Sequence, residues 1–325
     1  MHITIVTGDK IPSIKYGGVQ RVVWCLGKEL HKRGHKVTFI AGKGSYCPFA
    51  EVVEINPDKD LKEQIPTNAD IVHFNIPVPE GFTRPHLLTI HGNGIPKNAD
   101  KNLVFVSQNQ ANRFGSQSFV YNGLDWDEYG QVDLTLSRKR FHFLGKAAWK
   151  VKNLRGAIAV TKQIPGGELD VLGGHRLNLK MGFRFTWSPR IHFHGMVDDR
   201  LKKIIMQQSK GLIFPVTWHE PFGLAITESL YMGAPVFGTP YGSLPELVTP
   251  EVGFLTNHEQ QMAEHIESHA YSPKTCHEYA RDLFNSSVMT DAYLKKYEAI
   301  LNGESLNETI PCIKDISRNL PWIQQ

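Results

Sequence analysis

The stretch WHEPFGLAITESLYMGAPVFGT, residues 218–239, places two glutamates around the start of a predicted helix. An apolar run that ends near Val216 predicts a strand, and it delivers Glu220 to a Pro-Phe-Gly turn. Glu228 follows eight residues later, inside the helix. A carboxylate accepts hydrogen bonds on both oxygens and suits a vicinal diol, such as that of ribose. An acidic residue early in a helix also stabilises the helix dipole without further function, so both interpretations stay open.

Strands and helices alternate on both sides of this stretch. Apolar and β-branched runs predict strands at residues 2–8, 35–42, 51–55, 70–75, 86–92, 102–107, 118–123, 141–146, 168–174, 190–197, 211–216 and 234–239. Helical spacing predicts helices at 17–34, about 153–163, about 199–210, within the opening stretch and after about 257. Because strand–helix–strand units form parallel sheets, the sequence predicts an α/β fold.

Two sets of this alternation predict two Rossmann-like, doubly wound domains. The chain has 325 residues, and one compact core rarely exceeds roughly 250–300 residues. The segment 127–140 has no clear period, and we interpret it as a linker. We expect a first domain at 1–134, a second at 135–288, and a C-terminal helix and tail at 289–325 that packs back on the first domain. Ligands bind outside the carboxyl ends of such strands, so two facing sheets predict a site in the cleft between them.

Composition excludes several classes of protein. Hydrophobic residues make up 41% and charged residues 21%, with a net charge of +4, as is typical of a globular protein. This charge suits an anionic ligand but is too small to indicate a nucleic-acid binder. The four cysteines form no CxxC pair, so no zinc or redox motif is predicted. Without a signal sequence or a run of about 18 apolar residues, we expect a cytoplasmic protein.

A basic helix near the amino terminus is the candidate for contact with a membrane. Its basic residues are Lys32, Arg33 and Lys36, with Arg21 and Lys28 nearby. Such a face binds anionic lipids, and a solvated helix face explains it equally well. We expect any contact with the inner face of the membrane to be peripheral.

Glycines and a histidine mark the candidate ligand site of the first domain. Gly17 and Gly18 separate the first strand from the first helix, where backbone N–H groups and the helix dipole favour an anion. They do not form the GxGxxG dinucleotide fingerprint, and a plain turn is an equal alternative. His91 ends a predicted strand, which places its imidazole at the carboxyl edge of the sheet. A histidine at a strand end is also common as a structural residue.

Basic residues gather after the first strand of the second domain. Lys146, Lys150 and Lys152 lie in this loop, and Arg155 follows one turn later. A cation about 4 Å from a diphosphate gains on the order of 4 kcal/mol at an effective dielectric constant near 20. These lysines are therefore candidates for diphosphate binding, and a solvated basic loop is the alternative.

Two short motifs have the spacing of metal ligands. Asp125 and Asp127 form a DxD pattern just before the linker, and His192 and His194 lie on one face of a predicted strand. The position of the aspartates in NGLDWDEY, next to the linker, argues against a metal there. No third ligand accompanies the two histidines at a recognisable spacing, and a half-buried strand with polar tips explains them. We therefore predict no metal site.

The stretch HEPFGLAITESLYMGAPVFGTPYGSLPELV, residues 219–248, strongly resembles the donor-site signature of retaining glycosyltransferases of the GT-B fold. This family, glycosyltransferase family four, includes bacterial polysaccharide and lipid glycosyltransferases. Its signature is Glu, seven residues, Glu, a small-Gly-x-Pro-Val strand and a Gly-x-x-Pro-Glu turn. The other matching blocks occur in the same order: Gly17-Gly18, His91, Asn122-Gly123-Leu124-Asp125, Gly145-Lys146 and His194-Gly195. The resemblance covers residues 1 to about 302 and leaves the tail from about Ser305 unmatched.

The resemblance implies a nucleotide-sugar donor and a role for each matching side chain. Glu228 would bind the donor ribose, and Glu220 would contact hydroxyls of the donor sugar. Lys146 and Lys152 would hold the diphosphate, and His91 would lie near the reaction centre. The implied catalytic residues are thus His91, Glu220 and Lys146.

Glycines and backbone groups complete the implied site. Gly17 and Gly18 would border phosphate and acceptor, and His194 with Gly195 would form the wall around the nucleotide base. The N–H groups presented at the helix start would belong to Phe222, Gly223, Leu224 and Ala225. The family usually has arginine at the position of Lys146, and its next lysine comes one residue sooner than Lys152. Lys150 is therefore a competing assignment.

The resemblance implies a retaining hexosyltransferase without cofactor or metal. Departure of the nucleoside diphosphate develops negative charge, which fixed cations and helix N–H groups stabilise. No residue stands out as a covalent nucleophile, so we expect front-face attack. A UDP-sugar is favoured over a GDP- or ADP-sugar, and the acceptor would be a polysaccharide, lipopolysaccharide or other lipid-linked glycan. A nucleotide-sugar epimerase and a non-catalytic sugar-nucleotide-binding protein are the alternatives.

Overall fold

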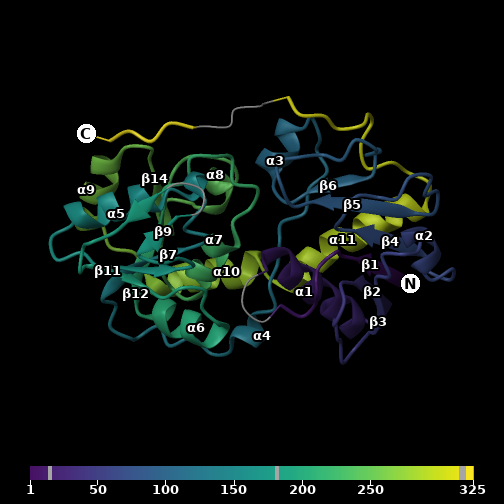
Figure 1. Cartoon of the computed structure of the whole chain (residues 1–325), viewed down its shortest axis with the longest axis horizontal. Helices are drawn as coiled ribbons and strands as arrows, with labels where there is room; N and C mark the ends of the chain where they lie inside the picture. The colour runs from purple at the N-terminus through teal and green to yellow at the C-terminus, as the bar shows by residue number, and fades with distance from the viewer. Residues whose placement is uncertain (14–16, 180–182, 315–319, 325) are drawn as a thin grey trace. The chain divides into compact units, whose positions relative to one another are not determined.

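The computed structural model describes residues 1–13, 17–179, 183–314 and 320–324 (Figure 1). The chain packs into two units. The first unit is Met1–Asp125 with Phe284–Ile316, and the second is Trp126–Leu283 with Ser317–Gln325. Among the described residues, none of the helices combines the length and apolar character that a membrane crossing requires.

The units divide the chain at residues other than the expected boundaries after 134 and 288. The Trp126 ring stacks on Tyr231 with 4.1 Å between the ring centroids, so the chain joins the second unit directly after Asp125. On the return, the Leu124 N–H donates to the Phe284 carbonyl over 3.0 Å. The chain therefore passes into the second unit after Asp125 and returns to the first unit at Phe284, where local packing determines the boundaries.

A six-stranded parallel sheet forms the centre of the first unit. Its strands are β1 (His2–Val6), β2 (Lys36–Ala41), β3 (Glu51–Glu54), β4 (Ile71–Phe74), β5 (His86–Ile90) and β6 (Leu103–Phe105). They pair in the order β3-β2-β1-β4-β5-β6. The helices are α1 (Gly18–Lys32), α2 (Leu61–Gln64), α3 (Gln108–Arg113) and α11 (Ser286–Leu301).

Strand β4 shows how both faces of this sheet are covered. Phe74 joins an apolar core with Ala111 of α3. Its neighbour His73 points to the opposite face, because successive strand residues alternate, and there it bonds to Tyr297 of α11. Helix α11 in turn packs against α1.

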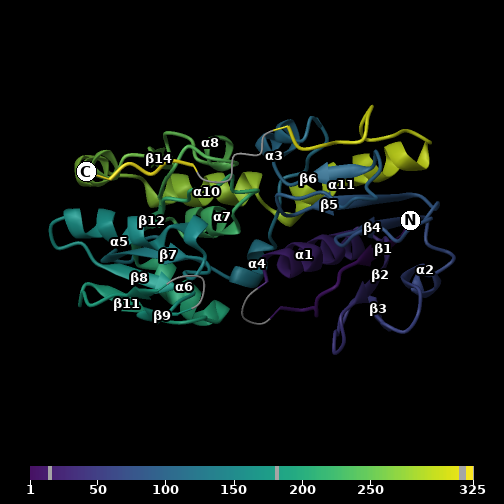
Figure 2. The ribbon, with the colours of Figure 1, turned by 45° about the horizontal axis from the view of Figure 1, so that its top comes forward.

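The second unit repeats this architecture. Its parallel strands are β7 (Arg140–Leu144), β8 (Leu169–Leu172), β11 (Ile191–Phe193), β12 (Ser209–Phe214), β13 (Val236–Gly238) and β14 (Gly253–Leu255), in the order β11-β8-β7-β12-β13-β14. Helices α5 (Leu154–Gln163) and α9 (Glu259–Ser268) share one core cluster. Helices α7 (Leu224–Tyr231) and α10 (Pro273–Leu283) lie side by side (Figures 1 and 2).

Shorter elements complete the second unit. They are α4 (Trp126–Tyr129), the 3-10 helix η1 (Lys150–Lys152), α6 (Asp199–Gln207), α8 (Leu244–Leu247) and an antiparallel hairpin of β9 (Leu177–Asn178) and β10 (Arg184–Phe185).

Both sheets have the strand order 3-2-1-4-5-6 when their parallel strands are counted along the chain. The order reverses between β1 and β4 in the first sheet and between β7 and β12 in the second. This confirms the predicted α/β fold with two Rossmann-like domains. Ligands of such sheets bind beyond the carboxyl ends of the strands at the point of reversal.

Some of the expected elements differ from the structure. The strand expected at 118–123 is wrong: Phe119 makes a single parallel bridge to Phe105, because β6 is only three residues long. Strand β14 was not predicted. The chain after 257 is also not helical throughout, since α11 ends at Leu301 and Ile323 pairs with His258 in an extended tail.

Buried histidines connect the sheets to their surroundings. His73 bonds the Tyr297 hydroxyl and the Thr89 Oγ1, each over 2.8 Å. His142 on β7 bonds the Ser209 Oγ over 2.6 Å. Burial lowers the pKa of each imidazole to about 3. Both histidines are therefore neutral in the folded protein at neutral pH.

We expect these histidines to make the protein sensitive to acid. The unfolded chain takes up their protons near pH 6.5, whereas the folded chain does not do so until about pH 3. Their contribution to stability is fully present above pH 6.5 and falls by about 1.4 kcal/mol per pH unit per histidine below it. Denaturant midpoints at several pH values measure this slope. His73→Gln should make the slope shallower, and the exposed His31→Gln should not; equal slopes in all three proteins would contradict the assignment.

Candidate functional site

The loops that follow β7 and β12 meet at the point where the second sheet reverses its order. Residues 145–153 follow β7 and contain η1, and residues 215–223 lead from β12 to α7. The Thr217 N–H donates to the Val151 carbonyl over 2.9 Å, so the two loops are joined directly. The structure thus brings together the predicted lysine loop and the predicted glutamate loop.

A buried ion pair connects these loops. Lys152 Nζ lies 2.5 Å from Glu220 Oε2, and the two side chains are 12% and 7% exposed. Trp218 Nε1 donates to the same oxygen over 2.8 Å. The Lys152 ammonium also lies 5.1 Å from the ring centroids of Phe214 and Trp218. Glu220 is therefore held in one position by a cation and an indole.

The three candidate lysines have different environments. Only Lys152 forms an ion pair with Glu220, whereas Lys146 and Lys150 are exposed. The Lys146 ammonium lies 5.2 Å from the ring centroid of Trp149. The geometry thus separates Lys152, which positions a carboxylate, from the two lysines whose ammonium groups face solvent.

Glu228 is buried on α7 and has a partner set of its own. The Tyr129 hydroxyl of α4 donates to Glu228 Oε1, and the Lys202 ammonium of α6 forms an ion pair with the same oxygen. Lys202 also lies 3.0 Å from Asp199 Oδ1 and 5.3 Å from the centroid of the Tyr129 ring. Glu228 is therefore fixed from two other elements.

Sequence reasoning missed Tyr129, Lys202 and Trp218. One signal points to partners of this kind: a glutamate predicted on a helix of mostly apolar residues is buried, and a buried carboxylate needs a cation or a donor. That signal calls for a partner without saying where in the chain it lies.

The start of α7 presents backbone donors. Gly223 is the residue before the helix, and in the described part of the chain no side chain caps the first turn. Phe222 is buried, whereas Gly223, Leu224 and Ala225 are partly exposed. The first N–H groups of a helix have no partner within it and attract an anion. The role implied for residues 222–225 in binding the donor stays a prediction.

The turn after β13 holds the Glu220 loop in place. Gly242 has a φ of +61°, and a Cβ at this position would lie 2.3 Å from the Glu220 nitrogen. The Ser243 N–H donates to the Glu220 carbonyl over 2.9 Å, and its hydroxyl donates to the Phe222 carbonyl over 2.7 Å. The Gly-x-x-Pro-Glu part of the signature is therefore a support for Glu220.

His91 of the first unit is a neutral imidazole. Its Nε2 lies 2.8 Å from Asn75 Oδ1, and Asn75 Nδ2 donates to the Val6 carbonyl. Because Oδ1 only accepts, Nε2 carries the proton, which leaves Nδ1 as an acceptor. Burial lowers the pKa of His91 to about 4. His91 therefore suits hydrogen bonding better than the supply of positive charge.

Gly17 and Gly18 stand at the start of α1, as predicted. Gly17 has a φ of +156°, and a Cβ there would lie 2.4 Å from Gln20 Oε1 and 2.6 Å from Ser13 Oγ. Gly18 is the first residue of the helix. The tight fit explains a glycine at position 17 by local packing, and residues 14–16 lie outside the described ranges.

The two metal-like motifs are occupied by other contacts. His192 and His194 each bond a separate carboxylate, Glu168 and Asp170, over 2.7 Å. Asp125 lies 2.6 Å from Lys28. In the described ranges no group of three histidine, cysteine or acidic residues is placed to hold a metal ion. Gly195 lies beside His194, and its N–H donates to the Gly174 carbonyl over 3.1 Å.

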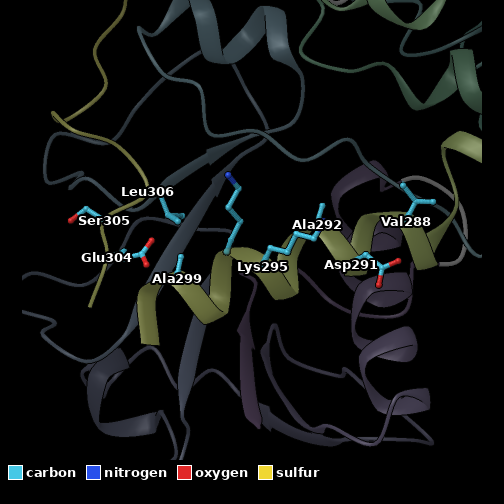
Figure 3. A pocket seen from close by; sticks show the side chains of 9 residues that line it. Val288, Asp291, Ala292, Lys295, Ala299, Glu304, Ser305 and Leu306 are labelled. Carbon is cyan, nitrogen blue, oxygen red and sulfur yellow. The ribbon is translucent and has the colours of Figure 1, made fainter. Parts of the chain in front are cut away.

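A separate pocket lies along α11 in the first unit. It has a volume of about 590 Å³ and is lined by residues that include Val288, Lys295 and Leu306. Figure 3 shows Lys295 rising from the helix beside Leu306. None of the predicted site residues lines this pocket.

A family of known sequences matches the middle of the chain. Residues 138–282, less than half of the chain, match the family described as "Glycosyl transferases group 1". An uncharacterized 41.2 kDa protein in the cps region of Klebsiella pneumoniae is 29% identical over 120 residues. That alignment covers 34% of this chain and 33% of the relative, so the chain spans about a third of the relative's length.

Solved structures share the fold over most of the chain. AviGT4, a glycosyltransferase involved in avilamycin A biosynthesis, has a TM-score of 0.76 at 19% identity, covering 93% of this chain and 98% of its own. Anabaena HepE in complex with UDP and glucose has a TM-score of 0.64 at 15% identity, covering 92% of this chain and 100% of its own. The fold is therefore that of GT-B glycosyltransferase structures. Together, the family match and these neighbours support a glycosyltransferase.

The ion pair predicts unequal effects of two lysine substitutions. Lys152→Ala would leave the Glu220 carboxylate buried without its cation, which should cost about 3–5 kcal/mol of unfolding free energy. Lys150→Ala, the matched control in the same short helix, removes an exposed side chain and should change stability by less than about 0.5 kcal/mol. Chemical denaturation of the two variants measures the difference. Equal destabilisation by both would show that the pairing is wrongly assigned.

Proposed function

We propose that this chain transfers a hexose from a nucleotide-diphosphate sugar to a glycan or lipid-linked glycan, with retention of the anomeric configuration. One observation carries the proposal: each signature glutamate uses a single oxygen for its protein contacts. Lys152 and Trp218 reach Oε2 of Glu220, and Tyr129 and Lys202 reach Oε1 of Glu228. Among the described residues, no hydrogen bond reaches the other oxygen of either glutamate. Both are thus oriented to accept hydrogen bonds from sugar hydroxyls.

The spacing of these carboxylates suits the order of groups in a nucleotide sugar. Glu228 lies five residues beyond Gly223, which corresponds to roughly 7–8 Å along the helix axis. Glu220 precedes the helix, and the uncapped N–H groups of α7 lie between the two. A ribose at Glu228, a diphosphate at the helix start and a sugar at Glu220 would follow the order of the donor molecule.

Charge at the helix start supports loss of the diphosphate. Negative charge grows on the leaving phosphate in the transition state, where preorganised donors and cations are most effective. We assign Lys146 and the N–H groups of residues 222–225 to this charge. Lys152 acts there mainly through Glu220, which it holds in place.

The contacts of Glu220 favour front-face attack over a covalent intermediate. A carboxylate oxygen that accepts from both an ammonium and an indole N–H is a weakened nucleophile. Glu220 is therefore assigned to the sugar hydroxyls and not to covalent catalysis. The roles of His91, Gly17 and Gly18 near the donor sugar and phosphate stay predictions from the resemblance, as do those of His194 and Gly195 at the base.

Relatives guide the choice of donor and acceptor. Because HepE, a neighbour in fold, binds UDP and UDP-glucose, we propose a UDP-sugar as the donor. Because a relative in sequence lies in a cps region, we propose a polysaccharide or its lipid-linked precursor as the acceptor. A lipid-linked acceptor would place the protein at the inner face of the cytoplasmic membrane.

Donor binding and transfer test the function in two steps. Melting temperatures with UDP, GDP, ADP and dTDP identify the base, since a ligand at 100 times its dissociation constant stabilises by about 2.7 kcal/mol. Donor turnover is then measured with and without a glycan acceptor. Transfer to the acceptor supports the proposal; turnover to an isomeric sugar nucleotide without acceptor would identify an epimerase instead.

The two glutamates should have different kinetic signatures. Glu228→Gln should mainly raise the donor KM, because ribose contacts are alike in ground and transition states. Glu220→Gln should mainly lower kcat, because its sugar changes as the bond breaks. Each effect should be about tenfold to a hundredfold, the value of one charge-assisted hydrogen bond. Glu264→Gln, an exposed glutamate on α9, is the control; normal nucleotide binding by Glu228→Gln would overturn its assignment to ribose.

We expect turnover to be independent of a metal ion, since Lys146 and helix N–H groups are assigned to the charge that a metal would otherwise neutralise. Activity should therefore survive excess EDTA. Loss of turnover that manganese or magnesium restores would contradict this expectation. Asp125→Asn and Asp127→Asn would then be the variants to examine, because these carboxylates form the DxD pattern.

A further inference from the structure

The connection between β8 and β11 contains a hairpin where a helix is usual. Neighbouring parallel strands are commonly joined by a helical crossover. Here the described residues of the connection form β9 and β10, in which Arg184 pairs with Asn178 and Phe185 pairs with Leu177. The hairpin lies beside β11, the edge strand of the second sheet (Figure 2).

In this hairpin the polar side chains are buried and the apolar side chains are exposed, which is the reverse of the usual pattern. Arg184 and Thr186 are buried, at 8% and 7% exposure. Phe183, Phe185 and Trp187 face solvent, at 65%, 40% and 84% exposure. A half-buried strand normally turns its apolar residues inward.

The outward side chains form what we call the apolar hairpin face, made up of Leu177, Leu179, Phe183, Phe185 and Trp187. Phe185 and Trp187 contact each other with 4.6 Å between ring centroids. Of the exposed large apolar side chains in the described ranges, half lie between Leu177 and Ile204. Exposed apolar patches of this kind mark surfaces that bind a partner or a membrane.

Bonds on the inner side fix this orientation. The guanidinium groups of Arg184 and Arg176 lie 5.1 and 5.7 Å from the Phe193 ring centroid on β11. Arg176 donates to the carbonyls of Thr186, Ser188 and Ile191. Turning the hairpin over would break these contacts, so the apolar face stays outward.

Four arginines lie in or next to the hairpin, and among the described residues none of them is paired with a carboxylate. In the described structure, Arg155, Arg176, Arg184 and Arg190 donate to carbonyl and hydroxyl oxygens. The sequence 171–197 contains four basic residues and no aspartate or glutamate. Lys150, Arg155 and Arg184 also border a hollow of about 390 Å³, together with Trp149 and Phe183. The exposed Lys150 and Arg155 therefore place positive charge beside the aromatic side chains, whereas Arg184 is buried on the inner side.

The basic face of α1, the earlier candidate for membrane contact, differs in this respect. Arg33 pairs with Glu29 and Asp291, and Lys28 pairs with Asp125. These carboxylates neutralise part of the positive charge that would attract anionic lipids to this face. The structure thus favours the hairpin over α1.

We propose that the apolar hairpin face inserts into the interfacial layer of an anionic lipid bilayer, with the exposed Lys150 and Arg155 beside it against the lipid phosphates. Aromatic side chains settle at the level of lipid headgroups, and basic residues beside them are attracted to anionic lipids. A second copy of the chain is a poorer occupant, because a two-fold interface would bring the same cations together.

Flotation with lipid vesicles tests the proposal directly. The wild-type chain should float with vesicles of phosphatidylcholine and phosphatidylglycerol at low salt, less at high salt, and not with phosphatidylcholine alone. The Phe183→Ser and Trp187→Ser double variant should reduce the bound fraction by about tenfold or more. Tyr46→Ser, which removes a similarly exposed aromatic ring from the first unit, is the matched control and should bind normally.

Further measurements distinguish the hairpin from α1 as the binding surface, and a membrane from a second copy of the chain as the partner. Lys150→Gln should weaken binding to anionic vesicles, whereas Lys32→Gln on α1 should not; the reverse result would overturn the proposal. Melting temperature and nucleotide binding of the double variant should equal those of the wild type, which separates this proposal from the proposed transfer activity. Failure of the wild type to float would overturn it. So would light scattering that shows a dimer which Trp187→Ser dissociates, because the hairpin would then join two copies.

Discussion

The buried ion pair between Lys152 and Glu220 is the contact on which the candidate site of the second unit depends. Removing two charges from water costs several kcal/mol for each ion, so such a pair forms only where the backbone fixes its geometry. The strand order provides this condition, since it sets the loops after β7 and β12 side by side. Gly242 packs closely against the Glu220 backbone, and the Ser243 N–H donates to the Glu220 carbonyl. The Glu220 loop, the start of α7 and the turn at Gly242 therefore pack together. This explains why they occur together in one sequence signature.

The two glutamates share a design that explains their separation along the chain. Each is buried, and each receives a cation and one further donor on a single oxygen. Their partners come from different elements, so the two positions are fixed independently. In the proposed function, a long ligand with hydroxyl groups at both ends and charge in the middle would bind along helix α7.

Both sheets could be predicted from the sequence because their strands are short apolar runs separated by helical periods. The hairpin could not, since Phe183, Phe185 and Trp187 have the alternation of a strand that buries them, and the structure exposes them. Glu220 and Glu228 were recognisable from the signature. Tyr129 and Lys202 were not, because they reach Glu228 from 99 and 26 residues away. The sequence left the choice among the lysines open. Their spacing along the chain does not show that Lys152 is buried beside Glu220, which depends on the tertiary structure.

The hairpin that connects β8 and β11 in place of a helix affects how easily the edge of the second sheet unfolds locally. Strand β11 is three residues long, lies at the edge and has one parallel neighbour, β8. Its cover is a two-stranded hairpin held by arginines, in place of a helix that would bury an apolar stripe. Small sheets of this kind are marginal by themselves. Backbone amides of β11 and the hairpin should therefore exchange with deuterated solvent through local fluctuations, while those of β7 and β12 in the centre of the sheet exchange only when the whole unit unfolds.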